Sequence, residues 1–73
     1  MKRYEEAIRC FDKAIQIDPS DSLALFHKGY ALAHLNRLVN AIKWYDKAIR
    51  LEPNNLEYVY YRQKAYDQLR KDY

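Results

Sequence analysis

The chain has 73 residues, of which 49% are hydrophobic and 32% are charged, enough for one small domain that buries less of its surface than a larger one would. Its formal net charge of +3 permits acidic partners but does not require nucleic acid. There is no apolar run near the roughly 18 residues of a membrane span, no apolar secretory signal and only one cysteine, so we expect a soluble, cytoplasmic protein that does not enter membranes.

The first predicted helix covers about residues 3–17. Its apolar side chains fall at helical spacing, three and four residues apart, so they share one face. Pro19 ends the helix, because the residue before a proline is pushed out of the helical region. Ser20 and Asp21 then offer side-chain oxygens that can cap the next helix.

Three more helices are predicted at about 22–35, 38–51 and 55–71. Asn36 follows the second one, and asparagine tolerates the left-handed conformation that a short turn requires. Pro53 ends the third helix, and Asn54 and Asn55 can cap the fourth.

The chain also repeats itself at an offset of 34 residues. Residues 7–19 and 41–53 share seven identities in thirteen positions, and further positions exchange similar residues. The residues that stand at fixed places in the two copies are Gly29, Ala41, Tyr45, Ala48 and Pro53 in one, and Ala7, Phe11, Ala14 and Pro19 in the other.

This pattern resembles the tetratricopeptide repeat along the whole chain. The resemblance implies an all-α fold, in which about four helices form antiparallel hairpins stacked as a short right-handed α-solenoid. It also implies that Ala7, Ala41 and Gly29 stand where helices approach closely, and that Phe11 and Tyr45 fill the space between helices. The chain departs from the usual repeat at Leu25, Lys28, Val59, Arg62 and Gln63.

The phase of the repeat predicts how the chain is divided. Residues 1–19 correspond to the second helix of an incomplete repeat, 20–55 to a complete unit, and 56–73 to the first helix of a third repeat. We therefore expect either an excerpt from a longer array or an unusually small member of the class. The first helix of one copy can complete the last, incomplete repeat of another copy, so we expect possible head-to-tail self-association.

Residues for catalysis or metal binding do not converge in the sequence. His27 and His34 lie seven positions apart on one helix, about 10 Å along its axis, too far to share one metal ion. Cys10 has no neighbouring motif of thiol chemistry, and phosphate-binding, zinc and nucleophile motifs are missing. We expect no enzyme, no cofactor and no metal site.

The resemblance also implies a concave binding surface made by the first helix of each repeat. We expect a protein or peptide partner there, bound by the scaffold through aromatic side chains, although Phe26 and Tyr60 could instead pack between adjacent helices. The positions that face inward in the family hold Leu23, Phe26, His27, Tyr30, Ala33 and His34 in one helix, and Glu57, Tyr60, Tyr61, Lys64, Asp67 and Gln68 in the next.

Other ligands fit the sequence less well. Family members that hold the C-terminal carboxylate of heat-shock chaperones use lysine, asparagine and arginine at positions that are mostly aromatic here, so that function is not carried over. Arg37, Lys43, Lys47 and Arg50 make the third helix basic, which raises nucleic-acid binding as an alternative. We favour a solvated convex face, with Asp46 paired to Arg50 and the aromatic residues mostly opposite. A structural fragment that self-assembles without a ligand is a further alternative.

Overall fold

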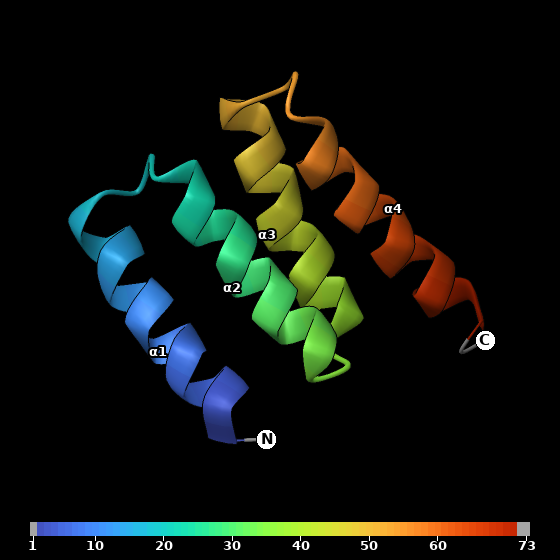
Figure 1. The fold of residues 1–73 in the computed structure, drawn as a ribbon, viewed down its shortest axis with the longest axis horizontal. Coiled ribbons are helices and arrows are strands. Elements are labelled where there is room, and N and C mark those ends of the chain that lie inside the picture. The colour runs from blue at the N-terminus through green and yellow to red at the C-terminus, as the bar shows by residue number, and fades with distance from the viewer. Residues whose placement is uncertain (1, 72–73) are drawn as a thin grey trace.

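The computed structural model describes residues 2–71 of the chain, and they form four helices: α1 (Lys2–Ile17), α2 (Ser22–His34), α3 (Leu38–Leu51) and α4 (Leu56–Lys71). Within these residues there is no strand. Neighbouring helices run antiparallel, and α3 lies between α2 and α4 (Figure 1). The predicted all-α class and hairpin arrangement are therefore confirmed. The predicted repeat boundaries also include residues 1, 72 and 73, which lie outside the described residues.

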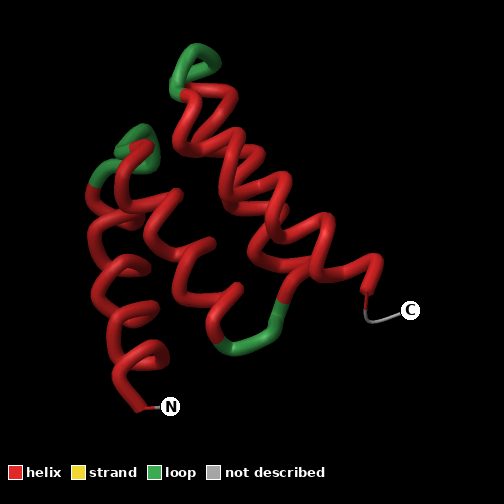
Figure 2. The backbone as a smooth tube through the Cα atoms, turned by 45° about the vertical axis from the view of Figure 1, so that its right-hand side comes forward, coloured by secondary structure: helices red, strands yellow, loops and turns green. Residues whose placement is uncertain are grey.

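The three connections between helices are short and use the residues that the sequence indicates. Connections 18–21 and 52–55 lie at one end of the helices and connection 35–37 at the other (Figure 2). The Asp21 carboxylate accepts a hydrogen bond from the backbone N–H of Ala24 (3.2 Å), and the Asn55 side chain accepts one from the N–H of Tyr58 (3.3 Å). Both are N-caps. Asn36 has a φ of 60°, the left-handed conformation predicted for it.

The tightest packing lies between α2 and α3. Ala41 and Ala48 are 0% exposed and Tyr45 is 1% exposed, all three on the face of α3 that meets its neighbours. Gly29 of α2 faces them, and a Cβ atom at Gly29 would lie 2.7 Å from Cδ1 of Tyr45 and 3.0 Å from the carbonyl oxygen of Ala41. Real Cβ atoms essentially never come as close as 2.7 Å to another heavy atom, so a larger residue at Gly29 would force these two helices apart.

The outer helices are less deeply packed. Within α1, Ala7, Phe11 and Ala14 are half-buried, and α1 joins α2 partly through an ion pair of 2.5 Å between Asp12 and Lys28. Only Tyr58 and Ala65 of α4 are buried.

The two prolines of the repeat pattern, Pro19 and Pro53, lie exposed in the connections, where they end helices rather than fill the core. Among the described helices, none is long and apolar enough to cross a membrane.

Candidate binding groove

The described helices leave a groove between α2 and α4, with α3 as its floor. We call it the α2–α4 groove, and it encloses about 180 Å³. That space suits one side chain rather than a whole small-molecule ligand, because ligand pockets usually start at about 300 Å³. Its lining residues are Tyr30, Ala33, His34, Leu38, Tyr45, Tyr61, Lys64, Ala65 and Gln68.

Aromatic rings form the walls of the α2–α4 groove. Tyr30 of α2 and Tyr61 of α4 meet edge to face in its wall, with ring centroids 5.6 Å apart and planes at 81°. Tyr30 meets His34 edge to face at 4.4 Å, and Tyr60 meets Tyr61 in the same way at 5.3 Å. These edge-to-face arrangements are favourable for aromatic pairs and fix the rings in place before any ligand arrives.

Each polar side chain of the groove can donate a hydrogen bond, and the Lys64 ammonium can only donate. The Lys64 ammonium lies 5.4 Å and 5.9 Å from the ring centroids of Tyr60 and Tyr61, within cation–π range. Among the described lining residues there is no carboxylate, while tyrosine hydroxyls, an imidazole, an ammonium and the Gln68 amide are present. The groove can therefore donate to a ligand oxygen, such as a peptide carbonyl or carboxylate.

Tyr45 of α3 lies at the floor of this groove. Burial raises the pKa of its phenol well above the ordinary value of 10.0, and the nearby phenols of Tyr30 and Tyr61 raise it further. The burial effect is the larger of the two, because a phenolate would lose its hydration there. The Tyr45 hydroxyl therefore stays protonated and able to donate at neutral pH.

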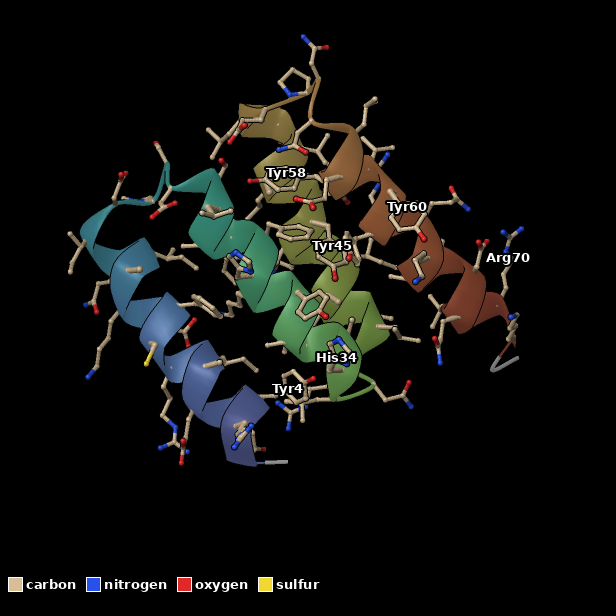
Figure 3. The ribbon with its side chains drawn as sticks, viewed as in Figure 1. Tyr4, His34, Tyr45, Tyr58, Tyr60 and Arg70 are labelled. Atoms are coloured by element: carbon tan, nitrogen blue, oxygen red, sulfur yellow. The ribbon has the colours of Figure 1, made fainter. Side chains whose placement is uncertain are left out.

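The structure brings only part of the expected surface into the groove. Tyr30, His34, Tyr61 and Lys64 line it, and Tyr60 stands beside them on α4, 58% exposed (Figure 3). These are the candidates that a peptide could touch together.

Other candidates lie elsewhere. Phe26 is 4% exposed and its ring stacks on Tyr58 at 4.6 Å, so it belongs to the core, which is the alternative raised for it from the sequence. His27 stacks on Phe11 of α1 at 5.5 Å. Leu23 and Glu57 are exposed and do not line the groove.

His34 is held by a ring from α1 and by a ring of its own helix, α2. Its ring stacks on Tyr4 of α1 with centroids 4.7 Å apart and planes at 3°, while Tyr30 meets it edge-on (Figure 3). The stacking orients the imidazole at one end of the groove.

The floor residues Leu38 and Tyr45, and Ala65 of α4, were not among the candidates for binding. A groove between the first helices of two repeats has the intervening helix as its floor, and the apolar and aromatic residues of α3 that face α2 and α4 could have been identified on that basis.

One interpretation of the basic helix needs correction, and a second has an exception. The Asp46 carboxylate pairs with Arg62 of α4 at 2.7 Å rather than with Arg50, because α4 packs beside this part of α3. The aromatic residues also do not all avoid the basic side: Trp44 lies there, with the ammonium of Lys28 3.9 Å and that of Lys47 4.4 Å from its ring centroid.

No group of three or more metal-ligating side chains occurs among the described residues. A comparison with protein-family models finds a match to the tetratricopeptide repeat over residues 1–55 of the 73. A search of curated proteins finds no match to the chain.

Proposed function

Because the chain belongs to the tetratricopeptide repeat family, whose members generally mediate protein–protein interactions, we propose that it binds a peptide segment of a partner protein in the α2–α4 groove. The single observation that carries this proposal is the pair Tyr30 and Tyr61, whose rings meet edge to face with centroids 5.6 Å apart and line the groove together with Tyr45. Rigid tyrosines offer a large contact area at a small cost in conformational entropy.

The size and polarity of the groove favour an extended segment with one anchoring side chain. The anchor would enter the space beside the contacting rings of Tyr30 and Tyr61, and the neighbouring backbone would run over exposed Tyr60. Lys64 and the tyrosine hydroxyls would donate to its carbonyl or carboxylate oxygens.

Proteins of this family are typically non-catalytic scaffolds, and we propose the same role here: a scaffold without enzymatic activity, cofactor or metal. Support comes from the lining itself, in which aromatic rings predominate and nucleophile and base do not form a hydrogen-bonded pair among the described residues. The cytoplasmic location stays a prediction from the sequence.

The proposal is tested with a peptide selected on the immobilised chain from a library of random sequences. Replacing Tyr30 and Tyr61 together with alanine should weaken its binding by about 1 to 3 kcal/mol, because both anchoring rings are lost. A matched control replaces two exposed lysines outside the groove, Lys13 and Lys43, with alanine and should leave the affinity nearly unchanged. Isothermal titration calorimetry provides the affinities, and circular dichroism verifies that each variant is folded.

Equal losses of peptide affinity in the tyrosine and lysine variants would indicate that the peptide binds on another surface. A folded tyrosine variant that binds as tightly as the unmodified chain would rule out the α2–α4 groove.

A further inference from the structure

A second groove lies between α1 and α3, with α2 beneath it. We call it the α1–α3 groove; it encloses about 300 Å³ and is lined mainly by apolar surface. Lys47 lines the α1–α3 groove, and Tyr45 lines the α2–α4 groove. Two positions along a helix correspond to a rotation of about 200°, so the two grooves open on opposite sides of α3. Its lining residues are Ile15, Pro19, Leu25, Trp44, Lys47, Arg50 and Leu51.

The floor and walls of the α1–α3 groove are aliphatic and aromatic. Leu25 of α2 is 3% exposed and forms the floor, while Leu51 remains 44% exposed at the edge. Ile15 and Trp44 are half-buried on the two sides. Apolar surface of this kind gains free energy when a further apolar side chain covers it, at about 25 cal/mol per Å².

The rim of the groove is positively charged. Lys47 and Arg50, one turn apart on α3, both border it, and neither forms an ion pair with another residue in the described part of the chain. The ammonium of Lys47 also lies 4.4 Å from the centroid of the Trp44 ring. That contact holds the lysine beside the apolar floor rather than far out in water.

Among the described residues, nearby carboxylates form no ion pair with this rim; Asp12 and Asp46 have cationic partners elsewhere, and Glu52 and Asp18 have neutral hydrogen-bond partners. Asp12 pairs with Lys28, and Asp46 pairs with Arg62. Glu52 accepts a hydrogen bond from the Ser22 hydroxyl, and Asp18 accepts one from the N–H of Ser20 at 3.0 Å. The two free cations at the groove therefore remain available to an external anion.

We propose that the α1–α3 groove is a second docking site, which takes an acidic peptide segment that carries a large apolar side chain between its carboxylates. The apolar side chain lies over Leu25 between Ile15 and Trp44, and the flanking carboxylates pair with Lys47 and Arg50. The charge of the rim selects an acidic segment, and the aliphatic floor gives it an anchor.

The same groove suits a nucleic acid less well, although it combines an aromatic ring with cations. Two ammonium groups already contact the Trp44 ring, at 3.9 and 4.4 Å from its centroid, so the ring is not free for a stacked base. The floor beside it offers aliphatic side chains and no hydrogen-bonding group for a base edge.

The experiment uses Trp44 as its reporter, because it is the single tryptophan of the chain and lies in this groove and not in the other. The probe is a short peptide with a central Leu-Leu flanked on both sides by glutamates, without aromatic residues. It should change the tryptophan fluorescence in a saturable manner. The same peptide with Ser-Ser at its centre should bind about tenfold more weakly or worse, because the apolar anchor is missing.

Charge-reversal variants separate the site from a general attraction. Lys47→Glu with Arg50→Glu should weaken binding of the Leu-Leu peptide about tenfold or more, because both rim cations become repulsive. The control Lys13→Glu with Lys43→Glu changes the net charge by the same amount at exposed positions that do not line this groove, and should have a far smaller effect.

Three results would overturn the proposal. One is the absence of a saturable fluorescence change with the Leu-Leu peptide. Another is an equal loss of binding in the two charge-reversal pairs, since that would indicate attraction without a site. The third is displacement of the bound Leu-Leu peptide by a lower concentration of a single-stranded oligouridine probe, since this would assign the face to nucleic acid.

Discussion

Ala41 lies where the packing of the repeat leaves no room for a larger side chain. It is 0% exposed, and its carbonyl oxygen lies at the closest approach of α2 and α3. Ala41→Leu should lower the free energy of unfolding by about 1 to 3 kcal/mol, because the added carbons must enter a contact that has no free volume. Urea unfolding followed by circular dichroism measures the loss.

The equivalent position one repeat earlier provides the control. Ala7 is only half-buried on α1, so Ala7→Leu should cost less than Ala41→Leu. Equal stability losses at the two positions would mean that the depth of burial does not decide the effect.

The raised pKa of Tyr45 predicts how the free energy of unfolding changes at alkaline pH. Its folded-state pKa is raised above 10.0, so above about pH 10 the unfolded chain releases a proton that the folded chain keeps. The contribution of Tyr45 to stability is thus fully present below pH 10 and is lost as the pH rises toward the folded-state pKa, with a slope of at most about 1.4 kcal/mol per pH unit.

Tyr45→Phe removes this titration. Above pH 10 the unmodified chain should therefore lose more of its free energy of unfolding than the Tyr45→Phe variant does. The control Tyr66→Phe, at an exposed position, should run parallel to the unmodified chain. Urea unfolding at about pH 9 and about pH 11, either side of the ordinary phenol pKa, makes the comparison. A Tyr45→Phe curve parallel to the unmodified one would contradict the buried phenol.

At the scale of the elements, the sequence predicts the limits of the helices well. Pro19 and Pro53 end helices by restricting the backbone before them, and Asp21 and Asn55 begin helices through side-chain hydrogen bonds. These effects act over a few residues, and they are therefore visible in the local sequence.

Contacts between elements are less predictable. Asp46 has Arg50 one turn away on its own helix, yet the observed partner, Arg62, comes from α4 because of the angle at which α4 packs. Phe26 fits both a groove and a core by residue type, and only the closeness of Tyr58 places it in the core. The position of Trp44 between two lysines likewise depends on how α2 lies against α3.

The outer face of α4 has a feature that bears on self-association. By the 34-residue offset Gln63 takes the place of Gly29, and Phe11 takes the place of Tyr45. In a head-to-tail contact built like α2 on α3, Phe11 of a second copy would meet Gln63 where a glycine is required within the chain. We therefore predict that Gln63 keeps such association weak.

Gln63→Gly should strengthen the association about tenfold or more, because it restores the close approach, even though a glycine inside a helix costs about 1 kcal/mol. The control Gln68→Gly introduces the same helix defect on the groove side of α4. Sedimentation equilibrium over a concentration series compares the two. An identical, strictly monomeric mass for both variants would end the prediction of head-to-tail association.

At the scale of the whole molecule, the α2–α4 groove and the α1–α3 groove, on opposite sides of α3, differ in the chemistry of their linings. The α2–α4 groove has rings and donors around one small space, and the α1–α3 groove has an aliphatic floor and a cationic rim. Helical periodicity together with the repeat pattern predicts the surface that holds the first groove. The second was missed because its lining comes from three helices and depends on the depth at which each one packs.

Peptide binding in the α2–α4 groove is tested most directly by an NMR titration of the isotopically labelled chain with the peptide selected on the immobilised chain. Binding in this groove predicts that the amide signals of Tyr30, Tyr61 and Lys64 move together and saturate at one affinity, while the indole N–H signal of Trp44, on the other side of α3, stays in place. Movement of the Trp44 signal with the amides of α2 and α4 unchanged would contradict it.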